Sequence, residues 1–113
     1  MKQGNLLLDS FPDSNRELFE TLVQTGKTRV ERIISSGQSS PEGFWYDQHE
    51  HEFVLILQGT AVIGFESGRR VALEPGTWLH IKPRQRHRVV ETSTNPQTIW
   101  LALFWTADES AES

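Results

Sequence analysis

The chain has 113 residues, which is enough for one domain with a single hydrophobic core but not for two. Hydrophobic residues make up 36% of it and charged residues 23%, a balance that excludes disorder throughout the chain. The formal net charge of −4 gives no support to a nucleic-acid binder, and the absence of cysteine excludes disulfides, thiolate zinc sites and a cysteine nucleophile.

The first element expected along the chain is a short helix. Ser14 and Glu17 form an S-x-x-E capping box, which is typical of a helix start. Four apolar residues then follow with the spacing of one helical stripe: Leu18, Phe19, Leu22 and Val23. Gly26 marks the expected end of the helix. We therefore assign residues 1–27 to an N-terminal segment that contains this helix.

From Thr28 onward the hydrophobic period changes to two, and short strands alternate with turns rich in Gly and Pro. The expected strands are 28–34, 53–57, 60–66, 70–73, 77–81, 87–92 and 98–105. Strands this short and this regularly spaced predict an all-β barrel or sandwich over residues 28–105. Residues 106–113 form an acidic tail with nothing to bury, and we expect it to be frayed.

The run His49-Glu50-His51-Glu52 stands at the start of the apolar strand 53–57. Unpaired charges are costly away from water, so four titratable residues at this position need a reason. One interpretation is a metal site, because imidazole and carboxylate ligands suit Zn, Mn, Fe, Ni or Cu. The other is a solvated strand entrance in which Glu52 pairs with an arginine. Side chains alternate along a strand, so His51 and Glu52 cannot enter one cavity unless a bulge re-aims one of them.

Two spacings along the chain carry a family resemblance. Glu52 stands seven residues before Gly59, and His87 stands eleven residues after the turn Leu73-Glu-Pro-Gly76. Together these features resemble the two sequence motifs of the small single-domain cupins, over residues 43–105. The resemblance implies a cupin-type jelly-roll β-barrel, a fold that is often dimeric.

The resemblance also implies a metal site. Many cupins bind one divalent transition metal through histidines and a glutamate of the first motif and a histidine of the second. Glu52 and His87 are then the expected ligands of Zn, Mn, Fe or Ni, with His49 or His51 completing the set. The sequence departs from the family pattern here, because the usual His-x-His positions fall near Trp45–Gln48.

Other residues are candidates for contacts with a substrate. Tyr46 and Gln48 lie near the expected cavity entrance, and cupin cavities are commonly lined by aromatic residues such as Tyr46. Three arginines flank His87 and either attract an anionic substrate or form a solvated charge cluster: Arg84, Arg86 and Arg88. His80 stands between two apolar residues, and we interpret it as a core or interface histidine rather than a ligand.

The partners expected from the sequence are a small molecule and a second copy of the chain. The stretch Trp100–Trp105 is apolar on both faces of its strand, which favours cover in a homodimer. No stretch approaches the roughly 20 apolar residues of a membrane-spanning helix. We therefore expect a soluble, cytoplasmic protein without a membrane or nucleic-acid partner.

Three functions are compatible with these features. The first is a metal-dependent enzyme of the oxygenase or isomerase type, acting on a small organic molecule. The second is a non-catalytic cupin that binds a small ligand or serves as a sensor without metal. The third is a folded barrel whose site has lost its chemistry.

Overall fold

The computed structural model describes residues 1–7 and 15–107, and every regular element within them is a β-strand. The eight strands are β1 (Leu18–Thr25), β2 (Thr28–Ser35), β3 (His51–Gln58), β4 (Ala61–Phe65), β5 (Arg70–Leu73), β6 (Trp78–Ile81), β7 (His87–Thr92) and β8 (Thr98–Trp105). All seven strands predicted from the sequence are present, so the all-β prediction is confirmed. Ser14 of the capping box and residues 108–113 of the predicted tail lie outside the described residues.

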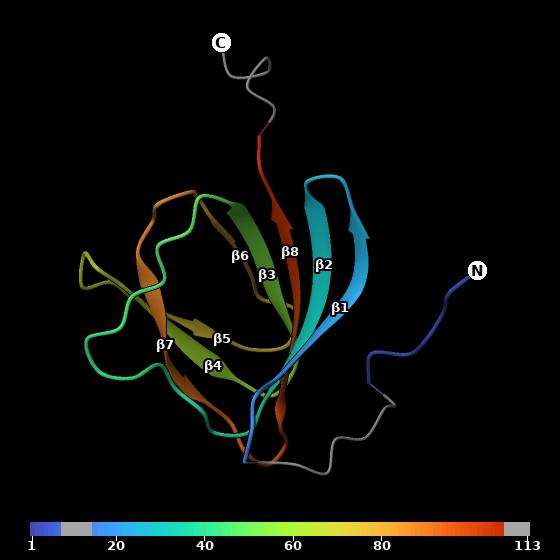
Figure 1. Cartoon of the computed structure of the whole chain (residues 1–113). Coiled ribbons are helices and arrows are strands. Elements are labelled where there is room, and N and C mark those ends of the chain that lie inside the picture. The colour runs from blue at the N-terminus through green and yellow to red at the C-terminus, as the bar shows by residue number, and fades with distance from the viewer. Residues whose placement is uncertain (8–14, 108–113) are drawn as a thin grey trace.

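The strands form two antiparallel sheets that face each other (Figure 1). The larger sheet has the order β1-β2-β8-β3-β6, and the smaller has the order β5-β4-β7. The last strand, β8, lies between β2 and β3 and pairs with both along its length. Within the described residues, strand ladders run inside each sheet and do not join the two sheets into a closed barrel. The fold is therefore a jelly roll that is open between its sheets.

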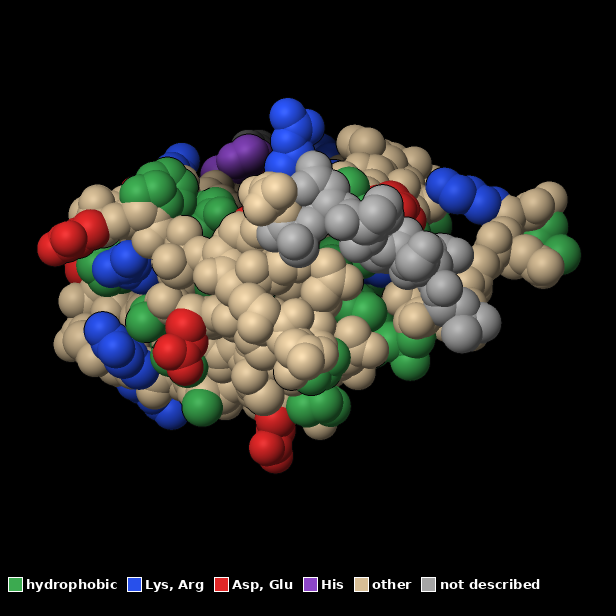
Figure 2. Space-filling model, turned by 90° about the horizontal axis from the view of Figure 1, so that it is seen from below, with side chains coloured by type: hydrophobic (Ala, Val, Ile, Leu, Met, Phe, Trp, Pro, Cys, Tyr) green, Lys and Arg blue, Asp and Glu red, His purple; other side chains and the backbone are tan. Residues whose placement is uncertain are grey.

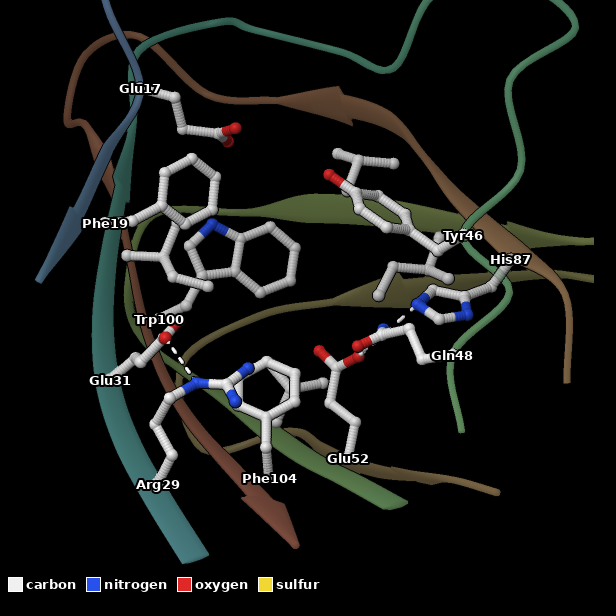
Figure 3. Close-up of a pocket in the computed structure, with 14 residues that line it drawn as sticks. Glu17, Phe19, Arg29, Glu31, Tyr46, Gln48, Glu52, His87, Trp100 and Phe104 are labelled. Atoms are coloured by element: carbon white, nitrogen blue, oxygen red, sulfur yellow. Dashed lines mark hydrogen bonds and ion pairs between the residues drawn. The ribbon is translucent and has the colours of Figure 1, made fainter. Parts of the chain in front are cut away.

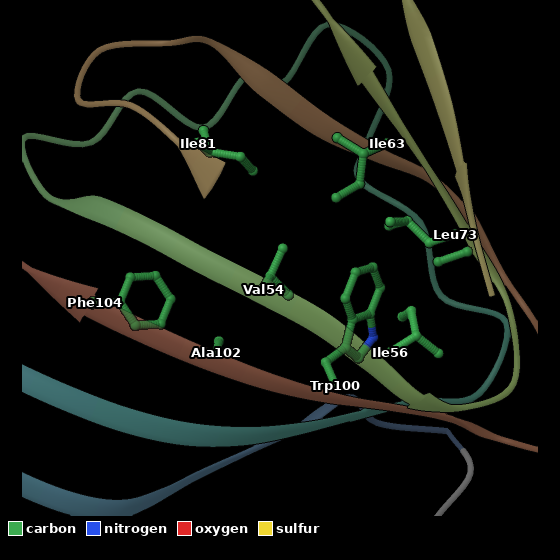
Figure 4. Close-up of a cluster of buried hydrophobic side chains, with 9 residues drawn as sticks. Val54, Ile56, Ile63, Leu73, Ile81, Trp100, Ala102 and Phe104 are labelled. Atoms are coloured by element: carbon green, nitrogen blue, oxygen red, sulfur yellow. The ribbon is translucent and has the colours of Figure 1, made fainter. Parts of the chain in front are cut away.

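One hydrophobic cluster lies between the sheets (Figure 4). The larger sheet contributes Val54, Ile56, Trp100, Ala102, Phe104 and Ile81, and the smaller contributes Ala61, Ile63 and Leu73. Ile56 is fully buried, and burying such a side chain contributes roughly 1.5–3 kcal/mol. Several members of this cluster also border the cavity described below, so the core and the site share walls.

Gly59 closes β3 at a position that only glycine fits. Its φ is +78°, in the left-handed region that side chains disfavour. A Cβ at this position would lie 2.5 Å from Ser93 Oγ and 2.7 Å from the carbonyl oxygen of Gln97. This requirement gives a physical reason for the glycine that ends the first motif.

The predicted N-terminal helix is wrong, because residues Leu18–Thr25 form the edge strand β1. Pairing with β2 satisfies the backbone groups along one edge of this segment, and a register shift lies between Thr21 and Val23. Phe19 is placed opposite Ile33 of β2, on the face that borders the cavity. Tertiary pairing has therefore outweighed a local pattern that suited a helix, as weak intrinsic propensity allows.

The outer face of β2 is covered by the N-terminal residues. Arg32 is 1% exposed there and forms a two-oxygen ion pair with Glu20 of β1, at 2.8 and 3.0 Å. Its Nη1 also donates to the carbonyl oxygen of Leu6 at 3.1 Å. A buried guanidinium needs such partners, so Arg32 ties the N-terminal segment to the sheet.

Charged side chains on the surface are mixed in sign. On the face drawn in Figure 2, acidic and basic side chains are scattered over the surface, and neither sign forms a continuous patch. In the described part of the chain no helix is long and apolar enough to span a membrane.

Candidate functional site

A cavity of about 260 Å³ lies between the two sheets, beside the hydrophobic core (Figure 3). Four aromatic rings form part of its wall: Phe19, Tyr46, Trp100 and Phe104. Its polar lining consists of Glu17, Arg29, Glu31, Gln48, Glu52 and His87. The fold gathers these side chains from both ends of the chain, because β1, β2, β3 and β8 are neighbours in one sheet.

Glu52 and His87 meet at one side of the cavity. Glu52 is the second residue of β3 and shares the inner face with Val54 and Ile56, while His87 begins β7. His87 Nε2 lies 3.4 Å from Glu52 Oε1, and Gln48 Nε2 donates to the same oxygen at 3.0 Å. The side chains of His87 and Glu52 are only 5% and 12% exposed. The pair is therefore held away from bulk water.

The surroundings of His87 favour its protonated form. Its Nδ1 lies 2.9 Å from the carbonyl oxygen of Gln85, which can only accept, so Nδ1 carries a proton. Burial favours the neutral ring, but the contact with Glu52, the bond to Gln85 and the charge of Glu52 outweigh it and raise the pKa of His87. The Glu52 side chain therefore stabilises the protonated form of the His87 ring.

Tyr46 and Gln48 are positioned by backbone bonds to β7 and the loop before it. The N–H of Tyr46 donates to the carbonyl oxygen of His87 at 2.7 Å, and the N–H of His87 donates back at 3.2 Å. The N–H of Arg84 donates to the carbonyl oxygen of Gln48 at 2.7 Å. The Tyr46 and His87 rings stack with centroids 5.3 Å apart. Burial and the charges of Glu17 and Glu52 raise the pKa of Tyr46, so its hydroxyl stays protonated.

Arg29 of β2 closes another side of the cavity. Its Nε lies 2.6 Å from Glu31 and its Nη1 lies 3.0 Å from Glu50. Its guanidinium carbon lies 4.2 Å from the centre of the Phe104 ring, within the range of a cation–π contact. Both carboxylates and the ring engage Arg29, so its charge is largely balanced before any ligand arrives.

Glu17 lies across the cavity from Glu52, as Figure 3 shows. Ser35 Oγ donates to Glu17 at 2.5 Å, and the indole N–H of Trp100 donates to Ser35 Oγ at 3.1 Å. The buried indole thereby finds the partner that its N–H requires. This relay fixes a carboxylate at a second polar end of the cavity.

The structure brings together four of the six predicted site residues. Those that border the cavity are Tyr46, Gln48, Glu52 and His87. His49 is exposed in the segment before β3, and His51 lies on the outer face of the sheet, stacked on Trp105 with centroids 5.1 Å apart. Strand alternation separates His51 from Glu52, as the sequence indicated.

Sequence reasoning missed Glu17, Arg29 and Glu31. Arg29 and Glu31 alternate with the apolar Ile33 on the same face of a predicted strand, which was the available sign of a polar patch on an inner face. Glu17 carried no such sign, because it was assigned to a helix cap.

The donor set at the cavity does not fit the transition metal that the resemblance implies. Among residues 1–7 and 15–107, no three His, Asp or Glu side chains are grouped so as to hold a metal ion. Near the positions expected for His-x-His, the cavity holds Tyr46 and Gln48, a protonated phenol and a carboxamide. Catalytic sites for such metals take about three protein ligands, and Glu52 and His87 supply two.

Comparison with known proteins agrees with the fold. A family model described as "Cupin domain" matches residues 31–104. The putative mannose-6-phosphate isomerase of Ralstonia eutropha JMP134 is 40% identical, with 95% of this chain and 100% of that chain covered and a TM-score of 0.90. No curated protein matches.

Two more distant structures are similar in fold. A cupin superfamily protein of Desulfitobacterium hafniense DCB-2 is 19% identical, with 95% of this chain and 94% of that chain covered and a TM-score of 0.76. The cupin domain of an XRE family transcriptional regulator from Enterobacter cloacae is 16% identical, with 81% and 98% covered and a TM-score of 0.68. With the motifs, the jelly roll and the match over 31–104, the chain belongs to the cupin family.

Proposed function

We propose that this cupin binds a small polyhydroxylated molecule, uncharged or carrying an amine, and exchanges protons with it through Glu52 and His87. The observation that carries the proposal is the contact of 3.4 Å between the buried His87 and the partly buried Glu52 at the wall of the cavity. A carboxylate beside an imidazolium offers a base and an acid at one point. Proton transfer at a carbonyl and its neighbouring carbon is the reaction class that such a pair suits.

The size and lining of the cavity support a ligand of about monosaccharide size. Its volume of about 260 Å³ lies just below the usual range for drug-sized ligands, roughly 300–1,000 Å³. Tyr46 and Gln48 add a hydroxyl and an amide beside the acid–base pair, and Glu17 adds an acceptor at the other end. Aromatic walls with a few fixed polar groups are typical of sites that orient a sugar-like molecule.

The charges along the cavity disfavour a phosphorylated ligand. Three carboxylates border it, from Glu17, Glu31 and Glu52. Arg29 supplies the guanidinium among its described lining residues, and that group is engaged by Glu31 and Glu50. A phosphate dianion would meet these carboxylates without a free cation to offset them. The Ralstonia protein is named as a putative isomerase of a sugar phosphate. For this chain we therefore propose an isomerase reaction on a sugar that carries no phosphate.

The proposed reaction needs no metal. The metal site predicted at His49, His51, Glu52 and His87 stays a prediction, and only the last two of these side chains converge. Glu52 takes the proton from the carbon beside a carbonyl, and His87 donates a proton to the carbonyl oxygen, which leaves an enediol. His87 then takes the proton of the neighbouring hydroxyl, and Glu52 returns its proton to the former carbonyl carbon, so the carbonyl has moved by one carbon and both side chains are restored.

Calorimetry with mannose, mannosamine and mannose 6-phosphate tests the ligand class. We expect the first two to bind and the phosphate to bind least. Glu52→Gln and His87→Gln should each weaken binding about 5- to 150-fold, the equivalent of roughly 1–3 kcal/mol for a buried polar partner lost. Glu74→Gln, in an exposed turn outside the cavity, is the matched control.

Two results would contradict the proposal. One is tightest binding of the phosphate, with that binding lost in Arg29→Gln. The other is sugar binding that neither cavity variant alters. Carbon NMR of the bound sugar then separates the enzyme from the sensor, because a sensor cupin binds the same molecule without converting it.

A further inference from the structure

Two histidines lie side by side on the outer face of the larger sheet, away from the cavity. His80 of β6 pairs in register with Phe53 of β3, so it is the diagonal neighbour of His51. His51 Nδ1 and His80 Nε2 are 3.0 Å apart, and the two ring planes differ by 18°. His80 is exposed and His51 is partly exposed, so solvent reaches the pair.

Trp105 of β8 holds both rings in place. Its indole plane lies 4° from the His51 ring and 16° from the His80 ring, with centroids 5.1 and 5.6 Å away. Trp105 pairs in register with His51, so the sheet itself places the indole under the two imidazoles. Packing on a large flat ring limits how far the imidazoles turn, which lowers the entropy that binding an ion would cost.

The spacing of the two nitrogens suits one shared ion. Two nitrogens at about 2.1 Å from the same metal, in adjacent coordination positions, are separated by about 3 Å. The 3.0 Å between His51 Nδ1 and His80 Nε2 matches this separation. Without an ion, one N–H can bridge the two nitrogens as a hydrogen bond, and an ion replaces that proton.

We propose that His51 and His80 form a two-histidine site for a divalent transition metal on the outer face of the sheet, separate from the cavity. Imidazole nitrogen selects Cu²⁺, Ni²⁺ or Zn²⁺ over Mg²⁺ or Ca²⁺, and the affinity should be greatest for Cu²⁺. No third His, Asp or Glu joins a cluster here within the described residues, so water completes the coordination shell.

The site is independent of the proposed function in the cavity. His51 and Glu52 are consecutive on β3 and therefore point to opposite faces of the sheet. The side chain of His87 is 5% exposed, and its two ring nitrogens already contact Glu52 and the carbonyl oxygen of Gln85. Substitutions in the outer pair, His51 and His80, should therefore weaken metal binding by the chain, and substitutions in the cavity pair should not.

Titration calorimetry of the metal-free chain with NiCl₂, CuCl₂ and ZnCl₂ tests the site. We expect about one ion per chain. His51→Gln and His80→Gln should each weaken binding more than about tenfold. Even the mutation of a residue that only hydrogen-bonds to a metal ligand lowers metal affinity about 10- to 100-fold. Two matched controls should keep the wild-type affinity: His49→Gln, which removes an exposed histidine two residues from His51, and His87→Gln, which removes the cavity histidine.

Tryptophan fluorescence gives a second readout at the same place. Cu²⁺ at the pair should quench Trp105, and Trp105→Phe should remove most of that quenching while leaving an ion bound. Unfolding curves of the two glutamine variants show that each is folded before it is titrated.

Three results would overturn the proposal. The first is wild-type affinity in both His51→Gln and His80→Gln. The second is an equal loss of affinity in His49→Gln, which would mean scattered surface binding. The third is a loss in His87→Gln alone, which would place the metal in the cavity and also count against the metal-free reaction proposed there.

Discussion

The two faces of the larger sheet carry different chemistry on the same strands. On β3, Glu52, Val54 and Ile56 point to the inside, and His51 and Phe53 point to the outside. The inner face combines a buried core with charged groups at the cavity. The outer face of β3, β6 and β8 carries aromatic and imidazole rings that are only partly covered.

This difference shows what burial requires of polar groups. On the inner face, charged groups at the cavity wall form ion pairs. Glu52 pairs with His87, and Arg29 pairs with Glu31 and Glu50. Outside, water reaches His51 and His80, and they need no fixed charge partner. The inner pairs are therefore fixed by the fold, while the outer pair is free to exchange its proton for another ligand.

The largest contrast between the faces should appear when neighbouring residues of β3 are truncated. Ile56 is 0% exposed in the core, whereas Leu55 is partly exposed on the outer face. Ile56→Ala should lower the free energy of unfolding by about 2–5 kcal/mol, because it leaves a cavity. Leu55→Ala should lower the free energy of unfolding by clearly less than Ile56→Ala does. Urea unfolding measures both, and equal losses would mean that the outer face is buried as deeply as the core.

A smaller effect should follow from pH on the inner face. The pKa of His87 is raised in the folded chain, so the folded state binds the proton more tightly than the unfolded state. The stabilisation is complete below the unfolded pKa, near 6.5, and is lost as pH rises through the raised pKa. In Glu52→Gln we expect the pKa of His87 to fall and this decline in stability to flatten.

Proton NMR of the His87 ring and urea unfolding at several pH values measure the two quantities. Glu74→Gln serves again as the control, because it removes an exposed carboxylate far from the pair in the sequence. A pKa of His87 unchanged by Glu52→Gln would show that the carboxylate does not act on the ring.

Seven of the eight strands and part of the site could be predicted from the sequence. Gly and Pro turns and period-two patterning placed seven of the eight strands, because each of these signals is local. Counting from Gly59 and from the turn before β6 picked out Glu52 and His87, which the structure brings to 3.4 Å. Alternation also separated His51 from Glu52 correctly.

The rest depended on contacts between distant segments. Leu18, Phe19, Leu22 and Val23 suit a helix by spacing, and only pairing with β2 makes them a strand. Arg29 reaches the cavity because β2 lies beside β8, which no short window of sequence reveals. The pairing of His51 with His80 likewise follows from the β3–β6 register.

The smallest change in an isolated chain should come from Trp78 on the outer face. It is 59% exposed and stacks on Phe53 with centroids 5.3 Å apart. In a monomer, Trp78→Ser should lower the free energy of unfolding by about 0.5–1.5 kcal/mol, which is the contribution of such an aromatic pair. The homodimer expected from the apolar stretch Trp100–Trp105 remains a prediction, and Trp78→Ser tests whether a second copy covers this face.

Sedimentation of the wild type and of Trp78→Ser, with EDTA present, separates these cases. EDTA removes any dimer that is held only by metal at the histidine pair. If a second copy covers the outer face, Trp78→Ser should weaken association by more than about 2 kcal/mol, as a buried tryptophan at an interface does. If the wild type instead sediments as a monomer at micromolar concentration, the outer face is exposed to solvent. The stacking on Phe53 is then the contact that Trp78→Ser removes.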